Sequence, residues 1–188
     1  MDEVLDESLF EREKPSVTYG GFWQRVGALI LDGIILTPVV FGLTYVNVVT
    51  WKSPLVLILA SLAGIAYKPL MEYVYGATWG KMAVKLVVKN RDLEKAELGE
   101  ILVRNVFHIV FPLISLYFTV MAYNDPGFES VSGFMAYSTF INGFAALKYV
   151  NFTSTFIDCI DAIVLASDKQ KRSLHDQIAG TVVIVQNS

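Results

Sequence analysis

The sequence predicts an all-α integral membrane protein, a four-helix transmembrane bundle that carries a small cytoplasmic β-ribbon. The 188-residue chain is 54% hydrophobic and has a mean hydropathy of +0.49, whereas soluble domains are roughly 45–50% apolar. Its charged residues cluster near the N-terminus, around residues 81–104 and around residues 168–176. Long apolar stretches separate these clusters, and such segregation is typical of membrane-spanning helices.

Four apolar stretches are long enough to cross a hydrocarbon core of about 30 Å as helices. We expect these spans at about residues 22–46, 54–75, 105–123 and 150–166. Residues 133–147 are also apolar, and we expect an interfacial or re-entrant segment there, or the outer part of one long last helix.

The distribution of lysine and arginine sets the expected orientation. The loop 76–104 is basic, and so is the tail after the last span, whereas the loop 124–132 contains neither residue type. Basic loops stay on the cytoplasmic side. We therefore expect a multi-pass protein of the bacterial inner membrane with both termini in the cytoplasm, which requires an even number of spans.

Outside the spans, the chain divides into short segments. Residues 1–20 are acidic and cannot bury much apolar surface, so we expect a flexible cytoplasmic tail. The membrane domain covers residues 21–185, and residues 186–188 are its C-terminal end. Within this domain, we expect residues 82–89 and 181–186 to form the two ribbon strands.

Composition and motifs exclude several function classes. The net charge of −3 gives no basic surface for nucleic acid. A single cysteine, Cys159, and only two histidines leave no thiolate or histidine-rich metal site. The chain lacks the GxGxxG, Walker A, HExxH and GxSxG motifs. We therefore expect no enzyme activity, no cofactor and no metal centre.

The first span contains two ionisable residues, Arg25 and Asp32. A charged side chain at the centre of a membrane helix costs about 2.5–3.5 kcal/mol on insertion scales, so it usually faces the bundle interior. Asp32 is too short to reach the headgroups and is expected inside, in a structural or functional role. Arg25 lies about 10 Å away along the helix axis. It either extends toward the headgroups or pairs elsewhere.

The regions around the cytoplasmic ends of the second and third spans each contain two ionisable residues. Lys68 and Glu72 have the i,i+4 spacing of a helical ion pair, and they either pair with each other or are solvated together. Arg104 is expected at the interface. His108 could titrate near neutral pH or be a hydrogen-bonded structural residue.

The last span contains Asp158 and Asp161 at i,i+3 spacing. Two ionised carboxylates on one helix face repel each other. Three alternatives remain open at this point: one carboxyl is neutral, a cation lies between them, or both are hydrated near the cytoplasmic end.

Several of these residues lie in short motifs that together resemble the RDD family of membrane proteins. The motifs are RVGALILD at residues 25–32, ATWGK at 77–81, EILVRN at 100–105 and RSLHDQIAGT at 172–181. The family is named for one arginine and two aspartates, and the resemblance implies that these are Arg25, Asp32 and Asp176. It also marks Asp161 as a position where relatives carry an acidic residue. The long stretch 124–148 departs from the simplest members.

Two functions follow as hypotheses. The resemblance implies transport, most concretely monovalent cation/proton antiport. In this hypothesis Asp32 exchanges the proton, Arg25 tunes Asp32 or gates the cytoplasmic side, and Asp176 organises the cytoplasmic mouth. Asp158 and Asp161 would be secondary ligands, and four spans suggest a homo-oligomer. The alternative is a non-transporting anchor or assembly module in the lipid bilayer, in which the Arg and Asp residues are structural. In either case we predict that Arg25 contacts Asp176.

Overall fold

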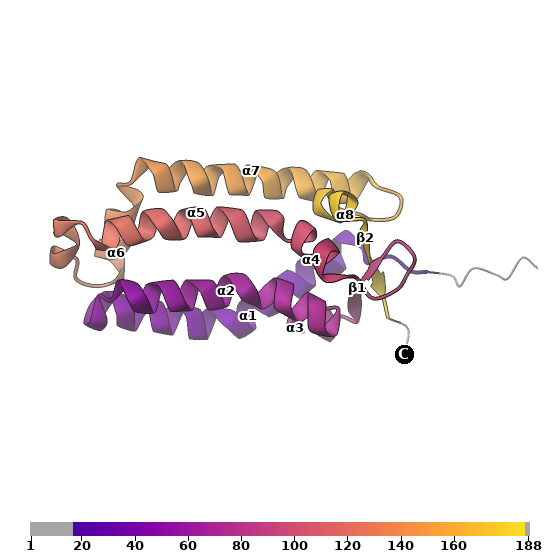
Figure 1. Ribbon diagram of the computed structural model, residues 1–188, viewed down its shortest axis with the longest axis horizontal. Coiled ribbons are helices and arrows are strands. Elements are labelled where there is room, and N and C mark those ends of the chain that lie inside the picture. The colour runs from indigo at the N-terminus through magenta and orange to yellow at the C-terminus, as the bar shows by residue number, and fades with distance from the viewer. Residues whose placement is uncertain (1–16, 187–188) are drawn as a thin grey trace, which may run out of the picture.

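The computed structural model describes residues 17–186, and these residues form an elongated bundle of four long helices (Figure 1). The first helix, α1 (Phe22–Val46), continues as the π-helical turn η2 (Asn47–Trp51). The other three are α2 (Pro54–Tyr75), α5 (Val106–Tyr123) and α7 (Ala145–Ser167). All four are long and apolar enough to cross a membrane. The predicted all-α membrane bundle with four spanning helices is therefore confirmed.

The turn between α1 and α2 is fixed by one buried amide. Asn47 donates a hydrogen bond from Nδ2 to the Ser53 carbonyl at 3.1 Å and accepts one from the Ser53 N–H at 3.0 Å. Ser53 in turn caps α2, because its hydroxyl accepts from the Val56 N–H at 3.4 Å, and Pro54 occupies the first helical position. The two spans are thus joined by a tight connection.

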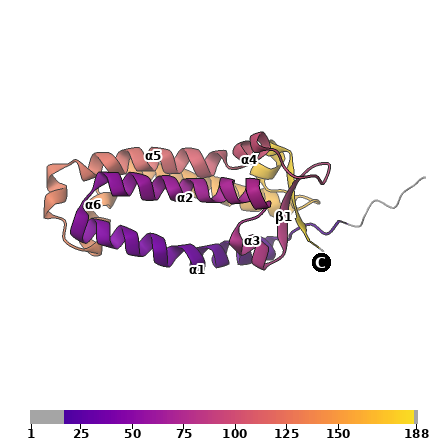
Figure 2. The ribbon, with the colours of Figure 1, turned by 60° about the horizontal axis from the view of Figure 1, so that its bottom comes forward.

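The far end of the bundle, opposite the ribbon, holds two short helices. These are η3 (Pro126–Ser130) and α6 (Phe134–Asn142), which lies beside the end of the bundle in both views (Figures 1 and 2). The last span begins at Ala145, five residues before the expected position 150. The chain leaves helical geometry at Phe144, so residues 145–147 belong to the last helix and 134–142 form a separate one.

The other end holds the predicted ribbon. Strands β1 (Leu86–Asn90) and β2 (Thr181–Val185) pair antiparallel, with Leu86 opposite Val185. The first strand starts four residues later than expected, because Met82 and Ala83 belong to a short helix, α3 (Trp79–Ala83). Helix α4 (Leu98–Arg104) leads into the third span, and α8 (Leu174–Ala179) directly precedes β2.

The N-terminal segment adds a further short backbone pairing to the ribbon. Tyr19 forms a bridge with Ile184, and the Gly20 N–H donates to the Val183 carbonyl at 2.9 Å. The expected flexible tail is therefore wrong for residues 18–20, whose backbone is paired. Residues 1–16, the rest of that tail, and residues 187–188 lie outside the described residues.

The fully buried side chains of the described residues lie toward the two ends of the bundle. Leu86, Val88, Ala96, Ile101 and Val183 form an apolar cluster under the ribbon. A second cluster of Val48, Tyr123, Phe128 and Val131 closes the opposite end. The buried side chains of the four long helices all lie near these ends, namely Ala28, Met71, Glu72, Ala122, Tyr123, Leu147 and Leu165. The middle of the bundle, in the part of the chain described, contains no buried side chain.

Candidate functional site

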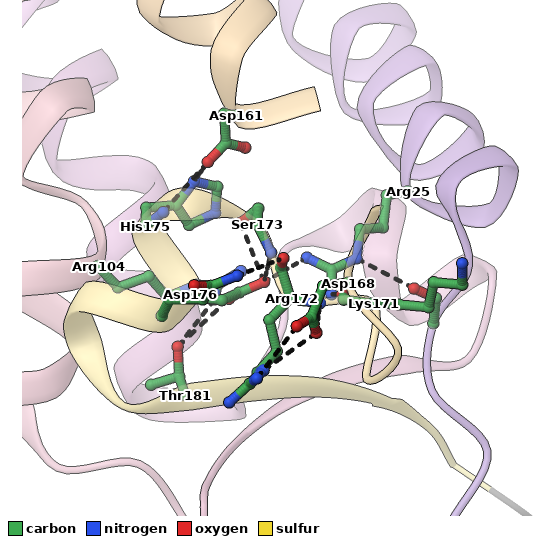
Figure 3. Close-up of polar contacts among 12 residues, drawn as sticks. Arg25, Arg104, Asp161, Asp168, Lys171, Arg172, Ser173, His175, Asp176 and Thr181 are labelled. Carbon is green, nitrogen blue, oxygen red and sulfur yellow. Dashed lines mark hydrogen bonds and ion pairs between the residues drawn. The ribbon is translucent and has the colours of Figure 1, made fainter. Parts of the chain in front are cut away.

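An ion pair between Arg25 and Asp176 joins the first span to α8. One guanidinium nitrogen of Arg25 lies 2.6 Å from Asp176 Oδ2. The other Arg25 nitrogens donate to the carbonyls of Gly20 at 3.2 Å and Lys171 at 2.5 Å (Figure 3). The predicted contact between Arg25 and Asp176 is confirmed. Arg25 pairs inside the protein, so its side chain does not extend toward the lipid headgroups.

Asp176 is fully buried and has partners on both carboxylate oxygens. It forms a capping box at the start of α8, where Oδ2 accepts from the Ser173 N–H at 3.1 Å and hydroxyl at 3.0 Å. Oδ1 accepts from the Thr181 hydroxyl at 3.3 Å and forms an ion pair with Arg104. Side chains from four elements thus converge on one carboxylate (Figure 3).

Arg104 extends this network to a second buried carboxylate, Glu72. Arg104 Nε lies 3.2 Å from Glu72 Oε2, which also accepts from Asn105 Nδ2 at 2.9 Å. Glu72 Oε1 forms an ion pair with Lys81 of α3. The Arg104 side chain is only 1% exposed and is therefore buried within the protein, while its expected position at the membrane interface stays a prediction. The Lys68–Glu72 pair is not formed, since Glu72 binds Lys81, Arg104 and Asn105 instead.

Burial shifts the ionisation of the two cations of this network that lie outside the spans. It lowers the pKa of Lys81 to about 8, against the attraction of Glu72. Burial also lowers the pKa of Arg104, again opposed by Glu72. Both cations are charged at neutral pH. The network therefore consists of Arg25, Lys81 and Arg104 facing Asp176 and Glu72.

Asp32 lies apart from this network and binds α3. Its carboxylate accepts hydrogen bonds from the Tyr67 hydroxyl at 2.9 Å, the Thr78 hydroxyl at 2.6 Å and the Gly80 N–H at 2.7 Å. Here α3 packs tightly on α1, because a Cβ on Gly80 would lie 2.0 Å from the Ala28 carbonyl oxygen. The expected interior position of Asp32 is borne out by these contacts. No cationic group of the described residues pairs with it.

The two aspartates of the last span differ in their surroundings. Asp161 accepts from the His175 N–H at 3.1 Å and lies 2.7 Å from His175 Nδ1 (Figure 3). Burial lowers the pKa of His175, and the hydrogen bond to Asp161 only partly opposes this shift. His175 is therefore neutral near pH 7 and donates to Asp161. Asp158, one turn earlier, is exposed.

Lys68 and His108 line a cavity between α2 and α5 with a volume of about 440 Å³. The other lining residues are Leu57, Ser61, Gly64, Ile65, Pro112, Ser115, Leu116 and Thr119. The described residues contain no group of three or more His, Cys, Asp or Glu side chains that could bind a metal ion.

The sequence predicted the charged residues on which these sites are centred, but not the side chains that bind them. Thr78 and Lys81 lie in the ATWGK motif, and Ser173 and His175 lie in RSLHDQIAGT. Only Ser173 gave a local signal, since a serine three residues before an acidic residue is a capping box. Tyr67 has no such signal, because its partner, Asp32, is 35 residues away.

Comparison with known proteins gives one match. The sequence model of the RDD family matches residues 19–180, which cover all four spans, α3, α4, β1 and α8. No curated protein and no solved structure matches the chain.

Proposed function

The chain belongs to the RDD family of membrane proteins, and from that premise we propose that it moves a small solute across the membrane. The observation that carries the proposal is the pocket in the middle of the bundle, where the described residues include no fully buried side chain. Buried side chains and apolar clusters lie at the two ends, and a cavity of about 440 Å³ lies between α2 and α5. Four helices form a thin wall, so we propose a homo-oligomer.

Monovalent cation/proton antiport is the most concrete form of this proposal, with Asp32 as the exchanging carboxylate. Asp32 has hydrogen-bond donors but no cationic partner among the described residues. A proton or a monovalent cation could therefore neutralise it without breaking an ion pair. Arg25 cannot tune it directly, because its guanidinium is bound to Asp176.

Flux in proteoliposomes tests this form of the proposal. We expect pulses of Na⁺, K⁺ or Li⁺ to change the internal pH of liposomes that contain the protein. Asp32→Asn should abolish the change, because asparagine keeps the shape but cannot titrate. Asp168→Asn is the matched control, since Asp168 is a carboxylate outside the spans, paired with Arg172, and should leave flux intact. Absence of flux from the unaltered protein with every monovalent cation would refute antiport.

A non-transporting anchor or assembly module is the second candidate, and the buried ion network favours it. Asp176 and Glu72 have charged or hydrogen-bonding partners on both oxygens, as a structural role requires. If Asp32 is also structural, Asp32→Asn should lower the melting temperature in detergent and leave any flux unchanged. The same variant thus separates the two candidates.

We also propose that both termini and the ribbon face the cytoplasm of a bacterial cell. The basic residues around the ribbon support this orientation. After Cys159→Ser removes the native thiol, a cysteine at Ser130 should react with an impermeant reagent added outside intact cells. A cysteine at Lys89 should not. Labelling at Lys89 would reverse the orientation.

A further inference from the structure

The cavity between α2 and α5 has a positive end and no acidic lining residue. Its walls are one stripe of each helix, residues 57, 61, 64, 65 and 68 facing residues 108, 112, 115, 116 and 119. Such spacings place side chains on one helix face. Each stripe runs over 11 residue steps, from 57 to 68 and from 108 to 119, so the cavity extends about 16 Å along the helices at 1.5 Å per residue. Lys68 and His108 lie together at the end nearer the ribbon.

The side-chain nitrogen of Lys68 has no hydrogen-bond or ion-pair partner in the described part of the chain. Glu72, the carboxylate one turn away, is already bound by Lys81, Arg104 and Asn105. No described residue forms a hydrogen bond or ion pair with the Lys68 ammonium, although Glu72 and Asp161 act on it from a distance. A lysine inside a spanning helix is costly unless something compensates its charge.

The two aspartates of α7 do not fill this gap. Asp161 is held by the His175 N–H and Nδ1. Asp158 acts electrostatically on Lys68 but lines no part of the cavity and forms no ion pair with it in the structure. An anion that enters the cavity could contact Lys68 directly, with Asp158 as its competitor at longer range.

The rest of the lining decides which kind of anion fits. Beyond the positive end, the wall is mostly apolar, with Leu57, Ile65, Pro112 and Leu116, and is interrupted by the hydroxyls of serine and threonine. Pockets of roughly 300–1,000 Å³ that are largely apolar with a few polar groups typically bind small organic molecules. The volume of about 440 Å³ lies in this range.

From this arrangement we infer that the cavity binds an amphiphilic monocarboxylate, with the carboxylate at Lys68 and the apolar chain along α2 and α5. A lysine ammonium is a compact charge with three donors and suits a single carboxylate. A short-chain acid from solution and a fatty acid from the bilayer share this chemistry. The inference rests on the proposed function only in treating the cavity as a solute site.

Titration calorimetry of the purified full chain in detergent micelles, with octanoate as the probe, tests the inference. We expect saturable binding that weakens at least tenfold in Lys68→Gln and is retained in Lys68→Arg. Octanamide, which has the same chain without the charge, should bind at least tenfold more weakly than octanoate. Lys148→Gln is the matched control, because Lys148 lies on a spanning helix outside the cavity lining.

Two further variants test whether octanoate occupies the cavity and whether Asp158 competes with it. Leu116→Trp fills the cavity and should abolish octanoate binding while the melting temperature stays close to that of the unaltered protein. Asp158→Asn should bind octanoate as tightly or more tightly, since it removes a competing charge. Unchanged octanoate affinity in Lys68→Gln, or equal affinity for octanamide or chloride, would overturn the inference.

Mass spectrometry of the purified protein distinguishes the two sources. Fatty acid that co-purifies with the unaltered protein and is lost in Lys68→Gln indicates a ligand from the bilayer, whereas octanoate binding without co-purified fatty acid indicates a ligand from solution. Octanoate binding without any cation flux would retain this site and refute the antiport. Cation flux without octanoate binding would refute only the site.

Discussion

The buried ion network makes a quantitative prediction about stability. Arg25→Gln removes the 2.6 Å contact to Asp176 but leaves that carboxylate its bonds to Arg104, Ser173 and Thr181. The loss is therefore about that of one hydrogen bond to a charged group, roughly 1.5–3 kcal/mol. Asp176→Asn should cost more, about 3–5 kcal/mol, because it deprives Arg25 of its only carboxylate contact among the described residues and leaves buried Arg104 with one carboxylate fewer.

The matched control is the pair Arg172–Asp168, which lies nearby and is partly exposed. Water and salt screen such a pair, so Arg172→Gln should cost less than about 1 kcal/mol. The assay is equilibrium unfolding of each variant in the same detergent, followed by circular dichroism. We expect the cost to rise in the order Arg172→Gln, Arg25→Gln, Asp176→Asn. A cost for Arg25→Gln no larger than that for Arg172→Gln would refute the argument that burial makes this pair important.

Two other predictions follow from local geometry. Gly80→Ala should destabilise the protein by about 2 kcal/mol or more, because its Cβ would overlap the Ala28 carbonyl. A Cβ at Gly99 in α4 would meet no atom within 4 Å, so Gly99→Ala should instead be neutral or stabilise by up to about 1 kcal/mol. A similar cost for both variants in thermal unfolding would contradict this prediction. Because the pKa of His175 is lowered on folding, its contribution is present above the unfolded pKa of 6.5 and is lost as pH falls below it. The free energy of unfolding should then drop by about 1.5 kcal/mol more from pH 6.5 to 5 in the unaltered protein than in His175→Asn, and equal pH profiles would contradict it.

The sequence predicts the spans and the ribbon because each of these elements has a local sequence pattern. Apolar length identifies the four long helices, and alternation identifies the two strands. The contact between Arg25 and Asp176 was predictable for a different reason. Once the number of spans is even, the start of the first span and the segment after the last one lie at the same end of the bundle.

The partners of the other charged residues could not be predicted, because helix rotation and short helices have weak signals. Lys68 and Glu72 have the spacing of a helical pair, yet Glu72 is bound by Lys81, which α3 brings back toward the span. Only five residues long, α3 has too few turns for an apolar period to reveal it. The start of the last span at Ala145 was also missed, because residues 145–147 continue the apolar stretch 133–147 without a break in the sequence pattern.

The network also limits where the protein could move during the proposed transport. Arg104 pairs with both Asp176 and Glu72, so α8 cannot separate from α2 at the ribbon end without breaking buried ion pairs. Breaking one such pair costs about 3–5 kcal/mol. Low-cost motion belongs instead to regions with few buried contacts. In this protein that region is the middle of the bundle, where Pro38 and Pro112 interrupt the hydrogen bonding of α1 and α5. A transport cycle would therefore bend the spans between two ends that stay closed as units.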